Sequence, residues 1–258
     1  MCLLIFGHRC NSHFPLVVAA NRDEFHARPT APAHFWENHP QVLAGRDLEQ
    51  GGTWMGVTRQ GRLAAVTNYR DPARTAPAPR SRGELPLDYL TGDDTPLQYL
   101  NTVAELADEY AGFNLLLGDR QDLYYFTNSL PREQRSPQKL AAGIYGLSNA
   151  RLDTPWPKIS HGKPQLEQLL AGDHLDHDFL AHVVGNRQLA EPDELHVQGL
   201  GHDMDHLLSA QFIVTPIYGT RSTTTLWLND KGKASWQELS FNPGGMETRR
   251  VNETFYIG

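Results

Sequence analysis

The residues best suited to chemistry lie near the start of the chain. Cys2 directly follows Met1, and it is one of only two cysteines in the sequence. If Met1 is removed, Cys2 carries a thiol and a free α-amine on one residue. The amine titrates at about 7.7 to 8.0 and the thiol at about 8.5, so near neutral pH the amine can accept the thiol proton. The sequence therefore predicts an amino-terminal nucleophile at Cys2.

A hairpin is predicted to bring polar side chains next to this cysteine. The apolar runs Cys2–Phe6 and Pro15–Ala20 are separated by a short polar turn and read as two antiparallel strands. Centring the turn near residues 11 and 12 pairs Cys2 with Asn21, with the charged residues of the sequence Asn-Arg-Asp-Glu just beyond.

Charges of both signs follow the second of these strands. We expect Arg22 to hold a thiolate or a substrate carbonyl, and Asp23 or Glu24 to orient the α-ammonium group. The alternative is a salt-bridged strand end beside a cysteine that serves only as a small apolar residue. The position next to Cys2 favours the functional interpretation.

Three further residues are candidates for stabilising or binding a substrate. Asn68 and Asn149 each close a predicted strand, where a side-chain amide can act as an oxyanion donor, although asparagine at such positions is commonly a turn former. Arg221 adds a cation on a later strand. These residues complete a predicted set for acyl transfer.

Metal and nucleotide chemistry find little support in the sequence. The cluster His202, Asp203, Asp205 and His206 lacks a recognised metal-ligand spacing and is better explained as a solvated loop and helix start. The same holds for His8, His13 and His26 as haem ligands. Neither a GxGxxG sequence nor a P-loop is present, so we expect no metal and no cofactor.

Composition narrows the class of protein. The chain has 258 residues, 40% of them hydrophobic, and a net charge of -7. This acidic balance argues against nucleic acid as a partner. A membrane span needs about 20 apolar residues, and no apolar run of this sequence approaches that length. The N-terminus lacks the pattern of a signal peptide. Two cysteines cannot build a disulfide framework, so we expect a cytoplasmic protein without integral membrane association.

The remaining pattern predicts strands and helices in alternating groups. Residues 28–40 are interpreted as an irregular excursion and 71–82 as a mobile loop, with no linker that divides domains. Strands are expected at 53–58, 62–67, 113–117, 123–127, 219–228, 233–240 and 254–257, and helices from 94, at 156–171 and at 175–184. This order fits antiparallel sheets with helices packed outside, in one domain spanning 1–258.

With these residues in view, the chain resembles the NRDE-motif family, also called the transport and Golgi organization 2-type proteins. The similarity covers essentially the whole length, in blocks that include MCLL, AANRDEF, GRDLEQGGTWMGV, AVTNYR, SRGEL, FNLLLGD, GLSNARLDTPWPK and YGTRSTT. The family is thought to be related to the N-terminal-nucleophile hydrolases. The resemblance implies an α+β fold, a four-layer αββα sandwich of two antiparallel sheets flanked by helices.

The resemblance also implies roles for individual residues. It implies Cys2 as the nucleophile, Asn149 as an oxyanion donor, and Arg22 with a nearby carboxylate as support for the amine and the sulfur. Related cysteine acylases carry Arg-x-x-Asp where this chain has Asn-Arg-Asp-Glu, so Asp23 and Glu24 both remain candidates. Asn21, Glu24, Asn68 and Arg221 are expected to bind substrate.

Two functions follow as hypotheses. The first is a cysteine N-terminal-nucleophile hydrolase that cleaves a non-peptide amide or acyl bond. The second is a carrier that binds haem or a fatty-acyl compound without transforming it, suggested by the haem and lipid associations of eukaryotic relatives and by Trp36, Trp54 and Trp156 near the motif blocks. Core packing is the ordinary explanation of those tryptophans. Either way the expected partner is a small molecule.

Overall fold

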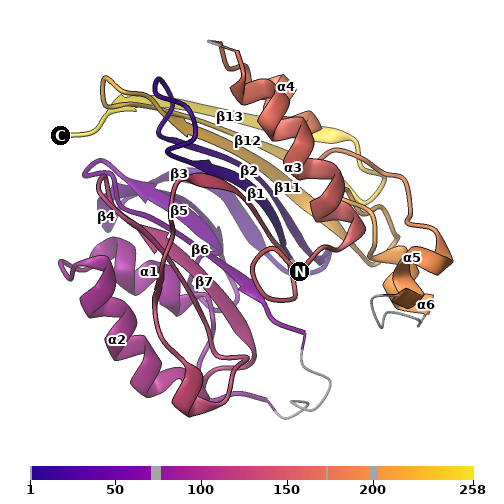
Figure 1. Ribbon diagram of the computed structural model, residues 1–258, viewed down its shortest axis with the longest axis horizontal. Coiled ribbons are helices and arrows are strands. Elements are labelled where there is room, and N and C mark those ends of the chain that lie inside the picture. Colours follow the sequence, from indigo (N-terminus) through magenta and orange to yellow (C-terminus); the bar gives the residue numbers. More distant parts are fainter. Residues whose placement is uncertain (1, 71–76, 173, 198–202) are drawn as a thin grey trace. The chain divides into compact units, whose positions relative to one another are not determined.

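The computed structural model describes residues 2–70, 77–172, 174–197 and 203–258, and the chain divides by its internal contacts into two compact units. The first unit comprises Met1–Ala27, Ala142–Ser148 and Leu152–Thr254, and the second comprises Arg28–Ala141, Asn149–Arg151 and Phe255–Gly258. Each unit is built on one sheet (Figure 1). The predicted α+β class with two antiparallel sheets is confirmed. A single domain over 1–258 stays a prediction.

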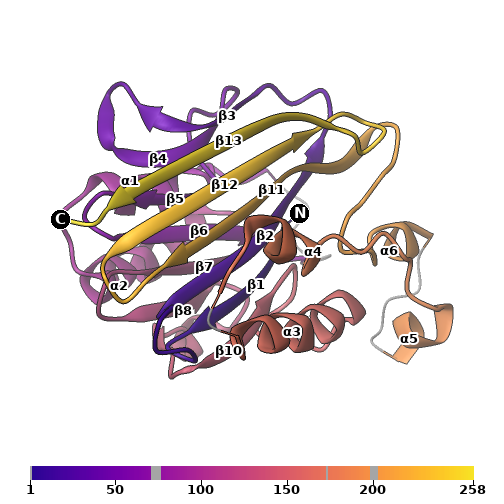
Figure 2. The ribbon, with the colours of Figure 1, turned by 90° about the horizontal axis from the view of Figure 1, so that it is seen from above.

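The first unit contains a six-stranded sheet in the order β10-β1-β2-β11-β12-β13 (Figure 2). Chain neighbours β1 and β2 form the predicted hairpin, and β2 also pairs antiparallel with β11. The strands are β1 (Cys2–His8), β2 (Leu16–Phe25), β10 (Gly143–Leu147), β11 (Tyr218–Leu228), β12 (Lys233–Phe241) and β13 (Glu247–Tyr256).

The register of the β1–β2 hairpin differs from our prediction by one residue. Cys2 lies opposite Arg22, and Leu3 lies opposite Asn21. Asn11 accounts for the difference, because its side-chain oxygen accepts hydrogen bonds from the backbone N–H groups of His13 and Phe14 and so holds the turn. A shift of one residue moves a side chain to the other face of a sheet. Arg22, rather than Asn21, therefore shares a face with Cys2.

Helices cover one face of this sheet. These are α3 (Pro157–Leu170) and α4 (His177–His182), and α5 (Pro192–Val197) and α6 (Asp203–Leu207) follow in the chain. Alternate residues of β1 and β2 pack against α3 and α4, forming a core of Leu3, Ile5, Val17, Ala19, Ile159, Leu166, Leu170, Leu175, Leu180, Val183 and Val184. The predicted helices at 156–171 and 175–184 are thus confirmed in type and position.

The second unit holds a seven-stranded sheet in the chain order β3 to β9. Its helices α1 (Glu84–Thr91) and α2 (Pro96–Leu106) pack on one face of that sheet, where they bury a second apolar core (Figure 1). Two short 3-10 helices, Ala107–Glu109 and Arg132–Gln134, complete it. The strands are β3 (Thr30–Trp36), β4 (His39–Asp47), β5 (Met55–Thr58), β6 (Leu63–Asn68), β7 (Phe113–Gly118), β8 (Leu123–Thr127) and β9 (Gln138–Lys139).

One interpretation of the second unit was wrong. Residues 28–40 were expected to be irregular because of their prolines, yet Thr30–Trp36 forms β3 and His39 begins β4. β3 is the edge strand of its sheet, where a proline such as Pro32 need not donate a ladder hydrogen bond. The register also shifts between Ala31 and His34, next to this proline.

The start of α2 follows its sequence signal. Thr95 caps the helix in a reciprocal arrangement with Gln98, and Pro96 occupies the first turn. Much of the loop expected at 71–82 falls outside the described residues, since 71–76 are not described. Along the described ranges, the helices are too short or too polar to span a lipid bilayer.

Candidate active site

Cys2 is the first residue of β1 and is partly exposed, and its sulfur is not in a disulfide. Its backbone is held on both sides. β2 pairs with it at Arg22, and the hydroxyl of Ser148 donates a hydrogen bond of 3.1 Å to the Cys2 carbonyl oxygen. A nucleophile is most effective when its position is fixed in advance. The strand end provides that fixation for Cys2.

A row of polar side chains extends from Cys2 across the sheet. Cys2 is paired with Arg22, and Arg22 is paired with Ser222 of β11. Directly paired residues project from the same face of a sheet. The row therefore places a thiol, a guanidinium group and a hydroxyl on the face opposite to the helix-packed core.

Ser222 is a residue that sequence reasoning did not single out. It is 5% exposed, and its Oγ atom has no hydrogen-bond partner among the described residues. A buried hydroxyl group that makes no hydrogen bond has lost its hydration without compensation. Such groups are uncommon at positions with a purely structural role. A run of serine and threonine in a strand gives no sequence signal that distinguishes it.

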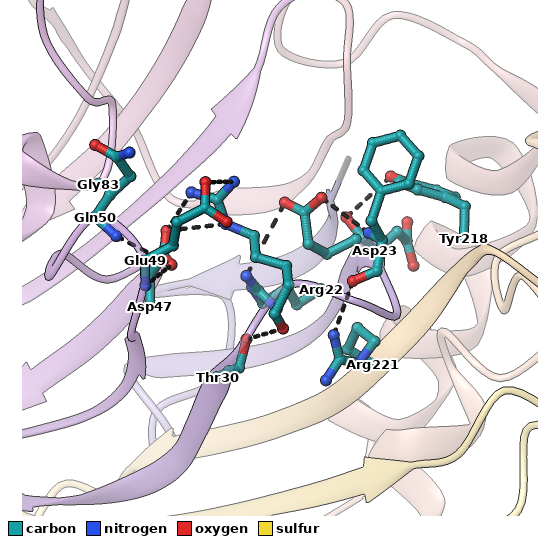
Figure 3. Close-up of polar contacts among 12 residues, drawn as sticks. Arg22, Asp23, Thr30, Asp47, Glu49, Gln50, Gly83, Tyr218 and Arg221 are labelled. Carbon is teal, nitrogen blue, oxygen red and sulfur yellow. Dashed lines mark hydrogen bonds and ion pairs between the residues drawn. The ribbon is translucent and has the colours of Figure 1, made fainter.

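Asp23 is buried next to the row but projects from the other face of β2. It is 1% exposed. Its Oδ1 accepts a hydrogen bond of 2.7 Å from the Thr220 hydroxyl. Its carbonyl oxygen accepts one of 2.9 Å from the Tyr218 hydroxyl (Figure 3). Burial raises the pKa of this carboxyl group, while Lys158, Thr220 and Arg22 act to lower it. A buried carboxyl group close to cations is typical of catalytic sites.

Lys158 is a second residue that the sequence analysis missed. It lies in the first turn of α3 with 4% exposure, and burial lowers its pKa, while Asp23 and Cys2 favour its charged form. The sequence did contain a signal for the burial of this lysine. Lys158 falls on the same i, i+4 line as Gly162, Leu166 and Leu170, which is the buried side of the helix. A lysine in an apolar line of a helix marks a buried charge.

The surrounding charges act on the Cys2 thiol in opposite directions. Burial raises the pKa of the thiol, Asp23 and Glu24 raise it further, and Arg22 lowers it. The thiol is therefore predominantly protonated at neutral pH. A base is needed to ionise it.

Glu24 and Arg221 lie at the more exposed margin of this group. Arg22 Nη2 is 4.0 Å from Glu24 Oε2, and Arg221 Nη1 donates a 2.9 Å hydrogen bond to the Phe25 carbonyl oxygen (Figure 3). Arg221 is the extra residue of a bulge in β11, between the partners of Asp23 and Arg22. Bulges commonly redirect a side chain next to a functional site.

Asn21 is not brought onto the face of Cys2. Its Nδ2 donates to the carbonyl oxygens of Val184 and Gln211 at 2.7 and 2.8 Å, and its Oδ1 accepts from the Thr223 hydroxyl at 2.6 Å. The residue is 1% exposed. These bonds attach β2 to Val184, Gln211 and Thr223, so the Asn21 amide has a structural role.

The two remaining candidates, Asn68 and Asn149, belong to the second unit. Asn149 is buried, and its Nδ2 donates a 2.8 Å hydrogen bond to the Asn68 carbonyl oxygen. Its own carbonyl oxygen accepts from the Arg70 backbone N–H at 2.8 Å. Asn149 directly follows Ser148, which holds Cys2, in the chain. The orientation of the Asn149 amide is thereby fixed within its own unit.

Within the described part of the chain, no three side chains of histidine, cysteine, aspartate or glutamate gather closely enough to hold an ion. His202 lies outside the described residues, as does the side chain of Asp203.

The fold and the site together define the class of this protein, which is an α+β protein with a cysteine at the start of its first strand. A family model described as Transport and Golgi organisation 2 matches residues 1–243, and the chain belongs to this family. It is 37% identical over 261 residues to the Transport and Golgi organization protein 2 homolog of Bos taurus, covering 93% of each chain. It is 36% identical over 260 residues to the Homo sapiens homolog, again covering 93% of each.

Solved structures give more distant similarities. A mutant of the conjugated bile acid hydrolase from Clostridium perfringens aligns with a TM-score of 0.48 and 12% identity, covering 100% of this chain and 92% of that chain. The N-acylethanolamine-hydrolyzing acid amidase ortholog of Caenorhabditis elegans aligns with a TM-score of 0.45 and 11% identity, covering 71% and 85%.

Proposed function

We propose that this protein is a cysteine N-terminal-nucleophile hydrolase that cleaves a non-peptide amide or acyl bond. Cys2 is the nucleophile after removal of Met1. Its α-amine is the general base, and Arg22 and Asp23 support the sulfur and the amine. The substrate is a small molecule.

One observation carries the proposal. Three ionisable residues, Arg22, Asp23 and Lys158, are each less than 7% exposed. Arg22 and Asp23 act electrostatically on Cys2, and Lys158 interacts electrostatically with Asp23 and Cys2. Burying a charge costs free energy, and replacing buried ion pairs by apolar residues is often neutral or stabilising. Three such charges around one cysteine are better explained by chemistry than by stability.

The reaction can be written from these residues. The Cys2 thiol transfers its proton to the α-amine, and the sulfur forms a bond to the substrate carbonyl carbon. The tetrahedral intermediate collapses as the bond to the leaving group breaks, and the α-ammonium group returns the proton to that leaving group. Water, deprotonated by the same amine, then attacks the thioester, which releases the acid and restores the thiol.

Arg22 and Asp23 have separable roles in this scheme. Arg22 shares the face of Cys2 and favours the thiolate, as its effect on the thiol pKa indicates. Asp23, as a buried carboxylate, is the counter-charge for the α-ammonium group. We assign this role to Asp23 rather than Glu24 because Glu24 is more exposed and one of its oxygens accepts from the neighbouring backbone N–H of Phe25. The role of Asn149 and Asn68 as oxyanion donors stays a prediction from the sequence.

Turnover by matched variants tests the proposal. A panel of N-acyl amides, aryl amides and acyl thioesters is screened with the wild-type chain, Cys2→Ala, Cys2→Ser and Cys10→Ser. Product is expected with the wild type and with Cys10→Ser, whose altered cysteine is exposed. Loss of at least about 1,000-fold is expected with Cys2→Ala, as for removal of other nucleophiles. Equal turnover by Cys2→Ala would refute the nucleophile.

The carrier hypothesis predicts a different result in the same preparation. Haemin and an acyl-CoA are titrated into the wild type and Cys2→Ala. Saturable one-to-one binding that is equal in both variants, without product over time, would replace the hydrolase proposal with a carrier.

A further inference from the structure

The first unit contains a cavity of about 200 Å³ beside the first turn of α3. Lys158 and His161 line it from α3, Ser209 and Gln211 line it from the chain that precedes β11, and Glu191 and Glu194 contribute near α5. Pockets for drug-sized ligands begin at about 300 Å³, so this cavity suits a smaller molecule. Cys2 is not among its lining residues.

Lys158 is the buried cation of this cavity. Its Nζ makes one hydrogen bond to a described residue, to the Leu208 carbonyl oxygen at 3.2 Å, and it lies 5.7 Å from the centroid of the Trp156 ring. An ammonium group has three N–H donors. Asp23 favours the charged form of this ammonium group electrostatically, and its one hydrogen bond to a described residue leaves donors for a further acceptor.

The neighbouring polar side chains are already engaged. Gln211 Nε2 donates to the Lys158 carbonyl oxygen at 2.9 Å, and its Oε1 accepts from the Asn186 backbone N–H at 3.2 Å. The Ser209 hydroxyl donates to the His206 carbonyl oxygen at 2.7 Å and accepts from the Ala190 backbone N–H at 2.9 Å. Lys158 is therefore the cationic donor among the lining residues that are buried. The positive end of the α3 dipole acts in the same direction.

The acidic side chains of the cavity select among anions. Glu191 and Glu194 are exposed, in contrast to the buried Lys158. A ligand with negative charge only would be repelled by these carboxylates, whereas one that also carries an amine would be attracted at both ends. The lining thus has a cationic interior residue and an anionic rim.

We propose that this cavity binds a small amino acid-like molecule, with its carboxylate on Lys158 and its amine toward Glu191 and Glu194. The proposal rests on the cavity and not on Cys2 as a nucleophile. It assigns the buried lysine a ligand in addition to Asp23, which favours its charged form from within the protein.

Lysine NMR tests the proposal directly. The chain has five lysines, so protein labelled with ¹³C at the lysine ε position gives five signals, and Lys158→Arg identifies that of Lys158. Glycine, β-alanine and 4-aminobutyrate are the probes, with acetate and methylamine as single-charge controls. At least one amino acid should shift the Lys158 signal saturably, with a dissociation constant on the order of 1 mM. Absence of a saturable shift with all three amino acids would overturn the proposal.

Matched variants separate the two ends of the ligand. Lys158→Met should weaken binding at least tenfold, measured by Trp156 fluorescence, whereas Lys163→Met, on the same helix but paired with Asp153 at 2.8 Å, should leave it unchanged. The double substitution Glu191→Gln with Glu194→Gln alters exposed residues only and should reduce amino acid affinity to that of acetate. Acetate binding as tightly as the best amino acid in the wild type would contradict the role of the rim.

The Cys2→Ala variant distinguishes this proposal from the hydrolase proposal. Amino acid binding should persist in Cys2→Ala, since Cys2 does not line the cavity. Hydrolysis without amino acid binding would overturn the cavity proposal alone. Binding without hydrolysis would leave the cavity proposal standing and count against the nucleophile.

Discussion

Arg22 of β2 lies directly opposite Cys2 of β1, so the guanidinium group and the thiol share one face of the six-stranded sheet. Asp23, one residue further along β2, projects from the other face and is also buried. The strand thereby separates its two charges, with the cation on the side of the sulfur and the anion behind. This separation explains how both signs of charge can act on Cys2 without forming a simple salt bridge with each other.

The pH dependence of Cys2 alkylation should follow these charges. Burial raises the pKa of the thiol above its ordinary value. Asp23 raises it and Arg22 lowers it, so Asp23→Asn should move the alkylation midpoint to lower pH and Arg22→Gln to higher pH. The rate of reaction with iodoacetamide is followed by mass spectrometry in a Cys10→Ser background. Shifts in the reverse directions would show that neither charge acts on the thiol as described.

Ser222→Ala should affect activity without reducing stability. The Ser222 hydroxyl is buried without a partner among the described residues, so its removal should leave the free energy of unfolding unchanged or raise it by up to about 1 kcal/mol. Turnover should fall about tenfold if the hydroxyl contacts substrate. Thr220→Val is the matched control, because it removes hydrogen bonds to Asp23 and to the Ile213 backbone and should cost about 1 to 3 kcal/mol. Unchanged turnover would exclude Ser222 from substrate binding.

Asn21→Ala should act on stability rather than on Cys2. Three buried hydrogen bonds are lost, so the free energy of unfolding should fall by roughly 3 kcal/mol in urea denaturation. The alkylation profile of Cys2 should not change, because Asn21 carries no charge and projects from the opposite face. Asn242→Ala, in an exposed turn, is the control and should cost less than about 1 kcal/mol. A shifted alkylation profile in Asn21→Ala would return this residue to the site.

Asp47 should make stability depend on pH in the acidic range. Burial opposes its ionisation, but hydrogen bonds from Arg28 and from the backbone of Glu49 and Gln50 outweigh burial and hold its pKa below its usual range (Figure 3). A carboxyl group whose pKa is lower in the folded than in the unfolded state stabilises the folded protein at pH values above its unfolded-state pKa. This stabilisation is lost as the pH falls through the folded-state pKa. Asp47→Asn should therefore cost roughly 1 to 3 kcal/mol at pH 7 and progressively less below pH 3.8.

The control for Asp47→Asn is the ion pair that Arg28 also forms with Glu49. Arg28 Nη1 lies 3.3 Å from Glu49, which is half exposed, so Glu49→Gln should change the free energy of unfolding by less than about 1 kcal/mol. A cost for Asp47→Asn that stays constant from pH 7 down to pH 2 would contradict an ionised Asp47.

The sequence allowed the sheets and main helices to be predicted where one periodicity dominated. The apolar run at Cys2–Phe6 and the caps around Thr95 are local signals, and both correspond to the observed elements. β3 was missed because Pro32 argues locally against a strand, whereas its tolerance depends on which strand lies at the sheet edge. That information is a property of the assembled sheet.

The candidate site, like the fold, could be predicted only in part from the sequence. Cys2, Arg22 and Asp23 could be grouped from the hairpin alone, but the register depended on how Asn11 holds the turn, which no run of apolar residues specifies. Lys158 could be recognised as buried from the apolar line of its helix, but its interaction with Asp23 could not be predicted, because that helix lies far along the chain. Ser222 became visible only through pairing across three strands.

Intact-mass measurement of the protein mixed with a hydrolysable acyl substrate tests the central claim most directly. We predict a chain that lacks Met1 and carries one acyl group on Cys2, with the adduct absent from Cys2→Ala and removed over time in the wild type. A chain that retains Met1 while hydrolysing the substrate, or an acyl adduct that persists in Cys2→Ala, would contradict the proposed nucleophile.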